Sequence, residues 1–248
     1  MKNKLISFLL ILSTNVFAQR EFYELRTYDL KWGTSSELLN NYLKNALLPA
    51  LNRKEVNKIG VFEEIRHERH STNKIYVLIP YASMDQYQKI YESLPNDKNY
   101  INDSKEFNSI PYDKVPYSRY NVSHFLAFEG FQKILKPKDG MSIYELRSYE
   151  SPSDDAYRRK VKMFNNGEFE IFTESGLRSV FYGEKISGNQ MPILTYMLVH
   201  ESMELRRIGW ENFMAHPDWK KLSSIEEYKN TVSNIIVTFL KPLAYSQL

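Results

Sequence analysis

The sequence predicts an α+β protein built from two tandem ferredoxin-like βαββαβ domains that close into one barrel with an internal pseudo-twofold. Two observations carry this prediction. The chain repeats itself, and each copy alternates strand-like and helix-like segments in the order β-α-β-β-α-β. Such a unit leaves one face of its sheet bare, and a second copy in the same chain can cover that face.

The repeat is visible at three anchors that occur in the same order in both copies. They are FYELRTY (22–28) with IYELRSY (143–149), VLIPYASM (77–84) with YMLVHESM (196–203), and VSHFLAF (122–128) with VSNIIVTF (232–239). Three ordered matches indicate duplication, because chance explains one at most. The offset falls from 119 residues at the second anchor to 110 at the third, so we expect nine additional residues before the last strand of the first copy.

The first copy begins with an alternating apolar and polar segment at 22–30, which is typical of a strand. Thr34 to Glu37 has the spacing of a helix capping box. The helix that follows reaches Pro49, which is expected to kink or break it. The remaining predicted elements are strands at 59–66 and 74–81, a helix capped by Ser83 and a last strand at 122–128.

The second copy repeats this order after a connection of turn-forming residues, Leu135 to Gly140. We therefore place the first domain at 19–136 and the second at 137–248. The predicted elements of the second copy are a strand from 143, a helix at 153–164, strands at 178–184 and 192–200, and a last strand at 232–240.

The first 18 residues have the order of a secretory signal peptide. Lys2 and Lys4 precede a short apolar run, and small residues follow at a cleavage site after Ala18. We expect an exported protein of a bacterial periplasm or the medium, with no membrane association after cleavage. The chain has no cysteine and a formal charge of only +3 with scattered Lys and Arg, so disulfides, thiolate metal sites and nucleic-acid binding are not expected.

Each copy places charged residues inside its first strand. Side chains two residues apart share one face of a strand, so Glu, Arg and Tyr of each YELRxY segment lie together. We expect this polar face to look into the space between the sheets. One interpretation is an ion-pair ladder that fixes register; the other is a cavity in which Arg receives an anionic or carbonyl group. The residues concerned are Glu24, Arg26, Tyr28, Glu145, Arg147 and Tyr149.

The YELRxY strand, the kinked helix and the segment WENFMAHPDWKKL (210–222) together resemble the NIPSNAP family. The second copy is the closer match. The resemblance implies the dimeric α+β barrel fold, in which related proteins include cofactor-independent monooxygenases, isomerases and haem-binding enzymes. It implies no particular reaction, because NIPSNAP proteins have no established general activity.

Three histidines and a tryptophan have side chains that could take part in chemistry or binding. His216, beside Trp210 and Trp219, is the candidate proton acceptor; the alternative is a helix-terminal His packed on Trp. Trp210 is a candidate ligand contact or a core anchor. His67 and His70 lie in a predicted hairpin, where strand geometry separates them and disfavours a metal site. We expect no metal and no cofactor, and the sequence has no Gly-rich phosphate loop.

These patterns predict a protein that binds a small organic anion or carbonyl compound between its sheets. Two alternatives stay open. One is a cofactor-independent oxygenase or isomerase with His216 as base, and the other is a purely structural protein whose sheet faces are used up in packing. A homodimer is compatible with the sequence, as is a barrel closed within one chain.

Overall fold

The computed structural model describes residues 19–65 and 73–248. The predicted signal segment and the hairpin with His67 and His70 lie outside the described residues. Within those two ranges, no helix is long and apolar enough to cross a bilayer.

The first half contains the predicted βαββαβ order with additional short helices. Its elements are β1 (Phe22–Leu30), α1 (Glu37–Tyr42), the π-helical turn η1 (Leu43–Leu47), α2 (Leu48–Asn52), β2 (Gly60–Glu64), β3 (Lys74–Tyr81), α3 (Met84–Ser93), η2 (Leu94–Asn96), α4 (Lys98–Asp103), α5 (Lys105–Asn108) and β4 (Tyr117–Ala127).

The second half repeats the order. Its elements are β5 (Ile143–Glu150), α6 (Asp154–Met163), the π-helical turn η3 (Phe164–Glu168), α7 (Phe169–Glu174), β6 (Arg178–Ser187), β7 (Ile193–His200), α8 (Met203–Ala215), α9 (Pro217–Ser223), η4 (Glu226–Tyr228) and β8 (Asn234–Pro242).

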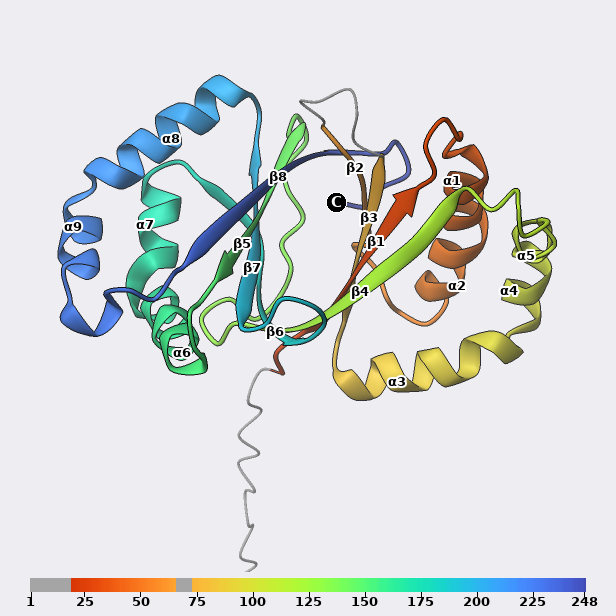
Figure 1. Ribbon diagram of the computed structural model, residues 1–248, viewed down its shortest axis with the longest axis horizontal. Coiled ribbons are helices and arrows are strands. Elements are labelled where there is room, and N and C mark those ends of the chain that lie inside the picture. Colours follow the sequence, from red (N-terminus) through yellow and green to blue (C-terminus); the bar gives the residue numbers. More distant parts are fainter. Residues whose placement is uncertain (1–18, 66–72) are drawn as a thin grey trace, which may run out of the picture.

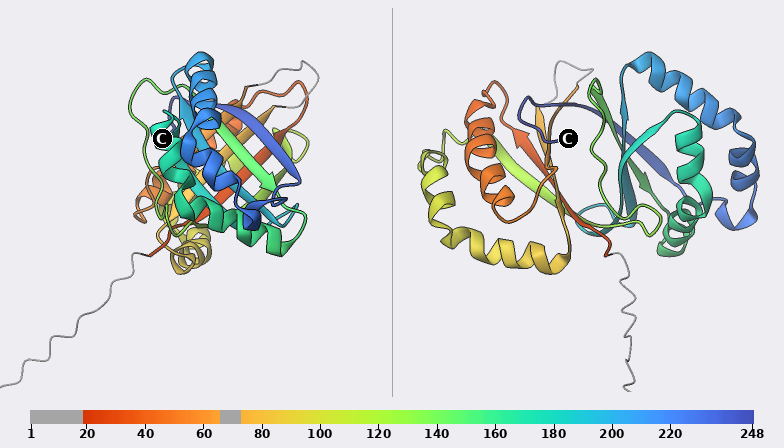
Figure 2. Two further views of the ribbon diagram at one scale, coloured as in Figure 1. Left: turned by 90° about the vertical axis from the view of Figure 1, so that its left-hand side faces the viewer. Right: turned by 180° about the vertical axis from the view of Figure 1, so that it is seen from behind.

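The eight strands close into one barrel in the order β1-β3-β2-β8-β5-β7-β6-β4. Each half contributes four neighbouring strands, and the halves join edge to edge through β2 with β8 and β4 with β6. The barrel lies at the centre of the molecule, with the helices of each half on opposite flanks (Figures 1 and 2). The prediction of two ferredoxin-like halves forming a pseudo-dimer is therefore confirmed, and the barrel closes within one chain. Edge pairing of this kind leaves no strand of the sheet without neighbours.

The halves are tied together at two further places. The tail after β8 runs back along β2, where the Leu243 amide donates to the Val61 carbonyl and the Gln247 amide donates to the Ile59 carbonyl. The connection between β4 and β5 buries Ile134 in the barrel core. The domain boundary at residues 136 and 137 stays a prediction.

Strand register corrects the expected length difference between the copies. Glu24 of β1 lies opposite His124 of β4, and Glu145 of β5 lies opposite Phe239 of β8, so the closing strands are offset by 115 residues rather than 110. The expected nine additional residues therefore overstate the difference. The short Val-Ser matches at 122 and 232 do not mark equivalent positions, because pairing with the first strand of each half sets which residues of β4 and β8 correspond.

The predicted helix cap is confirmed for α3, but the capping box predicted for α1 is not formed. Ser83 caps α3 as expected, with its hydroxyl accepting from the Gln86 amide. The predicted capping box at the start of α1 is wrong, because the Thr34 hydroxyl donates to the carbonyls of Lys31 and Pro116 instead. Pro49 does not end the helix; the chain passes through the turn η1 and resumes as α2.

Three apolar clusters show which side of each strand faces inward. One cluster draws on both halves and fills the barrel interior, with Tyr23, Leu25, Tyr144 and Leu146 among its members. Two others each belong mainly to one half and lie between its sheet and its helices. An eight-stranded barrel is just wide enough for side chains to fill it, and here large apolar groups do so.

The expectation that the Glu-Arg-Tyr faces look into the barrel is therefore wrong. Since Tyr23 and Leu25 point inward, Glu24, Arg26 and Tyr28 point outward to the helices, and the same alternation turns Glu145, Arg147 and Tyr149 outward. The physical reason is hydrogen bonding. The barrel interior offers apolar walls, whereas the outer face brings hydrogen-bond donors to each buried carboxylate, from the strands in the first half and from the strands and α8 in the second.

Candidate ligand-binding site

The two outward polar faces are covered in different ways, and the second half is the more tightly packed. Glu145 is fully buried and accepts hydrogen bonds from Arg147 Nη1 at 2.6 Å and from His200 Nε2 at 2.9 Å. Arg206 of α8 adds a bidentate contact at 2.8 and 2.6 Å. The Trp210 indole donates to the same carboxylate at 3.3 Å.

Electrostatics keep this carboxylate charged. Burial alone raises the pKa of Glu145, but hydrogen bonds from His200 and Arg206 and the charge of Arg147 outweigh it and hold the pKa well below its usual range. Trp210 covers the guanidinium of Arg147, with 4.3 Å between Cζ and the ring centroid. These contacts fit the ion-pair interpretation of the strand motif, and they assign Trp210 to the packing of the second half.

Another buried ion pair lies in the same helical layer. Lys160 of α6 contacts Glu168 at 2.8 Å, and both side chains are almost fully buried. The Lys160 ammonium also lies 4.5 Å from the ring centroid of Phe164. Burial raises the pKa of Glu168, and the nearby Lys160 charge opposes that shift. The helical layer of the second half is thus held by paired charges and stacked rings.

The first half has fewer donors at the equivalent place. Glu24 pairs with Arg26 at 2.5 and 3.3 Å and accepts from the Tyr81 hydroxyl at 3.0 Å. At the 119-residue offset of the second anchor, Tyr81 replaces His200, Tyr87 replaces Arg206 and Tyr91 replaces Trp210. Whereas Arg206 and Trp210 both reach the sheet, the Tyr91 side chain is 68% exposed.

A cavity of about 450 Å³ lies above Glu24 and Arg26 as a result. This volume is in the range of small-molecule sites. Its floor is the outer face of β1, β3 and β4, and α3 with the following turn forms a wall. Six tyrosines contribute to the lining, which comprises Glu24, Arg26, Tyr42, Leu51, Tyr81, Tyr87, Ile90, Tyr91, Leu94, Pro95, Tyr100, Tyr120, Val122 and His124.

Two of the lining tyrosines, Tyr81 and Tyr42, have hydroxyls that stay protonated at neutral pH. Burial, with the neighbouring Glu24 charge, raises the pKa of Tyr81, and burial with Tyr100 raises that of Tyr42. Tyr42 and Tyr100 pair through their hydroxyls at 2.8 Å. The cavity therefore combines one guanidinium, one carboxylate already engaged with it, and aromatic walls with polar edges.

Of the lining residues, only Glu24 and Arg26 were predicted from the sequence, and His124 is the histidine among those that were missed. Its Nε2 is buried and has no hydrogen-bond partner within the described part of the chain. The ring packs against Phe22 and Tyr87, at centroid distances of 5.3 and 4.9 Å. Burial lowers the pKa of His124, and the charge of Arg26 lowers it further against the opposing effect of Glu24, so the imidazole is neutral at pH 7. Alternation with Tyr120 and Val122 along β4 was the signal that could have found it.

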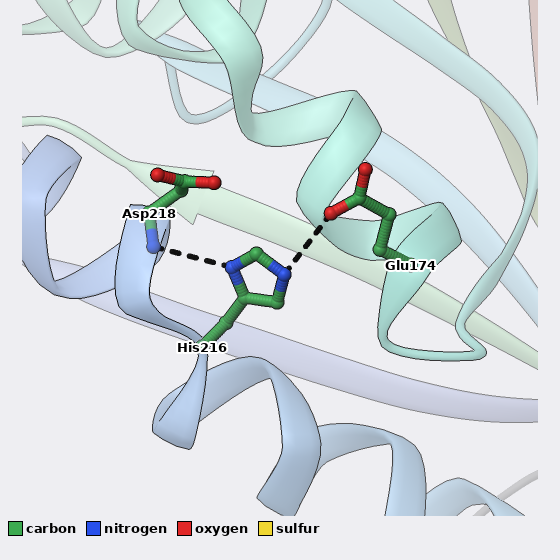
Figure 3. Close-up of side chains that lie close together, drawn as sticks. All are labelled: Glu174, His216 and Asp218. Carbon is green, nitrogen blue, oxygen red and sulfur yellow. Dashed lines mark hydrogen bonds and ion pairs between the residues drawn. The ribbon is translucent and has the colours of Figure 1, made fainter.

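The predicted catalytic residue His216 lies at the junction of α8 and α9, close to Glu174 and Asp218 (Figure 3). It is not among the residues that line this cavity. Its Nδ1 accepts from the Asp218 amide at 3.2 Å as the helix cap. Its Nε2 lies 3.1 Å from Glu174. The contact with the Asp218 amide occupies the Nδ1 lone pair, so in the neutral ring Nε2 carries the proton and donates to Glu174.

Glu174, His216 and Asp218 also form a group whose ligand atoms lie within 4.8 Å of one another. A metal ion needs a free nitrogen lone pair, and the helix cap uses the one that neutral His216 has. The geometry accordingly fits a helix junction better than a metal centre. His216 was predicted to accept a proton from a ligand. Since it does not line the cavity, the structure does not support that role there.

Comparisons with known proteins agree with this architecture. A family model described as NIPSNAP matches residues 23–111 and 144–247, one segment in each half. No curated protein sequence matches the chain.

Solved structures resemble the whole barrel at low sequence identity. A Fusobacterium nucleatum protein provisionally described as a monooxygenase is 8% identical, with 90% of this chain and 93% of that chain covered and a TM-score of 0.59. A Lactobacillus acidophilus protein with the same provisional description is 13% identical, with 90% and 94% covered and a TM-score of 0.59. A chlorite dismutase variant from Candidatus Nitrospira defluvii is 7% identical, with 91% and 92% covered and a TM-score of 0.51. At these identities the likeness concerns the fold alone.

Proposed function

Because the chain belongs to the NIPSNAP family, with one copy of the domain in each half, we propose that the two copies have divided their roles. The first half binds a small organic ligand in the cavity above Arg26. The second half uses the corresponding residues to stabilise the fold. The observation that carries this proposal is the contrast between Tyr91, which leaves the cavity open, and Trp210, which covers the equivalent arginine.

The lining supports a planar ligand with an anionic or carbonyl end. Arg26 is the cation that reaches the cavity, and a guanidinium pairs well with carboxylate and carbonyl oxygens. Tyrosine rings stack on flat apolar bodies, and their hydroxyls hold polar substituents. An aromatic carboxylate with a carbonyl group, such as phenylpyruvate, has all these features and fits a site of this size.

The proposed ligand site thus lies between the sheet and the helices of the first half, and not between the sheets as expected from the sequence. The two roles predicted for the Glu-Arg-Tyr face, ion pairing and ligand binding, are proposed for different halves of the chain. Glu145 and Arg147 support the ion-pair interpretation. Glu24 and Arg26 form the same kind of pair, and they support the ligand interpretation because they also line the cavity. Export after removal of the first 18 residues stays part of the proposal.

Calorimetric titration with phenylpyruvate tests the proposal. Tyr91→Trp introduces the residue that covers the arginine of the second half, and we expect it to weaken binding at least tenfold. Tyr112→Trp is the matched control, because Tyr112 is 91% exposed and lies outside the cavity lining. It should leave affinity unchanged.

Arg26→Lys tests the ligand's charged end. Lysine keeps the positive charge but loses the bidentate geometry, so we expect weaker binding with the fold retained. Absence of phenylpyruvate binding by the unsubstituted protein would contradict the proposed ligand class. Equal affinities of the unsubstituted and Tyr91→Trp proteins would show that the cavity is not the site.

A further inference from the structure

His124, one of the residues that line the cavity, has a buried ring nitrogen that the fold itself does not use. His124 Nε2 is buried, yet no group among residues 19–65 and 73–248 offers it a hydrogen bond. Leaving such an atom unpaired destabilises the fold, so native proteins seldom bury one without a reason. A bound ligand that pairs with Nε2 would remove this cost.

The surroundings of His124 define what it can do. Glu24 and Arg26 of β1, Tyr81 of β3, and Tyr87 and Tyr91 of α3 line the cavity with it. His124 lies directly opposite Glu24 in the strand register, so both side chains share the outer face with Arg26. Glu24 is already held by Arg26 and Tyr81, which leaves the imidazole as the base without a partner in the lining.

We propose that His124 is a catalytic proton acceptor and that the first half enolises a carbonyl ligand. With the ring proton on Nδ1, His124 Nε2 has a free lone pair and takes a proton from the carbon next to the carbonyl, and the C–H electron pair forms the new carbon–carbon double bond. The carbonyl electrons move to oxygen, where Arg26 stabilises the negative charge. The imidazolium then returns the proton to that oxygen, which gives the enol. No oxidant or reductant takes part.

This inference rests on the proposed ligand site and adds a reaction to it. A neutral imidazole is suited to the step, since only the neutral form can accept a proton. An adjacent guanidinium favours the developing enolate, as positioned charges do in sites sheltered from water. The second half has Phe239 at the register position of His124, so the reaction is assigned to the first half alone.

Phenylpyruvate serves as the probe, with binding and reaction measured separately on the full chain. Deuterium exchange of its methylene protons is followed by NMR, and affinity is measured by calorimetry. We expect the unsubstituted protein to accelerate exchange at least 100-fold over buffer, the low end for a positioned acid–base group. His124→Asn should abolish the acceleration while affinity changes less than tenfold.

His216→Asn is the matched substitution at the helix junction, and it should leave both readouts unchanged. Binding without accelerated exchange would overturn the proton transfer and leave the ligand site standing. No binding would overturn both proposals. Acceleration that survives in His124→Asn, or that is lost in His216→Asn, would overturn the assignment to His124.

Discussion

Replacing Glu145 by glutamine tests whether the second half is held by its buried ion pairs. The carboxylate is fully buried and receives five hydrogen bonds, two of them from Arg206 and one each from Arg147, His200 and Trp210. The glutamine amide has only one acceptor oxygen, and its NH2 group would face hydrogen-bond donors with which it cannot pair. It also leaves Arg147, which is only 9% exposed, without its counter-charge. Breaking a buried pair in this way costs about 3–5 kcal/mol of unfolding free energy.

The matched substitution is Glu24→Gln in the first half. Glu24 has fewer donors, namely Arg26 and Tyr81, and the Arg26 side chain is 17% exposed at the cavity. Hydrogen bonds to a charged group contribute about 1.5–3 kcal/mol, so we expect a smaller loss at this site. Urea denaturation of both variants at pH 7 gives the two values.

The pH dependence follows from the lowered pKa of Glu145. A lowered pKa means that the unfolded chain binds the proton more readily than the folded chain. The stabilisation is therefore complete above the ordinary value of 4.5 and is lost as the pH falls toward the lower pKa of the folded state. The difference between the unsubstituted protein and Glu145→Gln should be constant from pH 6 to 8 and should narrow below about pH 4.5. A loss under 1 kcal/mol at pH 7, or a difference that widens in acid, would refute the reasoning.

Three further predictions concern other parts of the chain. Lys160→Met leaves Glu168 buried without its partner and should lower the free energy of unfolding by about 3–5 kcal/mol. Adding Glu168→Leu to that variant should restore most of the lost stability. Urea denaturation of both variants measures these changes. Gly183→Ala places a methyl group 2.7 Å from the Phe125 side chain in the barrel interior and should cost about 1–3 kcal/mol in the same assay; an unchanged midpoint would contradict the packing. Expression in an exporting bacterium should yield a mature chain that lacks the residues up to Ala18; an intact mass that includes them would contradict the signal prediction.

Much of the architecture could be predicted from the sequence, because local pattern and duplication both report on it. The alternating segment at 22–30 and the strand-like segment at 74–81 predicted β1 and β3 with the bounds that the structure has. Ser83 marked the start of α3 because its side chain caps the helix whatever lies around it. The repeat predicted two halves of one kind, and the barrel confirms this.

The candidate site could be predicted only in part. Alternation correctly grouped Glu24, Arg26 and Tyr28 on one face but gave the wrong side of the sheet. A period of two is symmetrical, so it cannot say which face is inside. His124 was missed for a related reason, because its role depends on the register of β4 against β1 and on the helix α3 above it.

The sequence by itself determined the duplicated βαββαβ order and the pairing of Glu with Arg along the first strand of each half, because both depend on neighbours in the chain. The tertiary structure alone decided that the halves join at their edges and that the charged faces lie under helices. It also decided that Tyr91 leaves a cavity above Arg26, whereas Trp210 covers Arg147. These outcomes depend on contacts between segments that are far apart in sequence. Such contacts form only when the whole chain has folded.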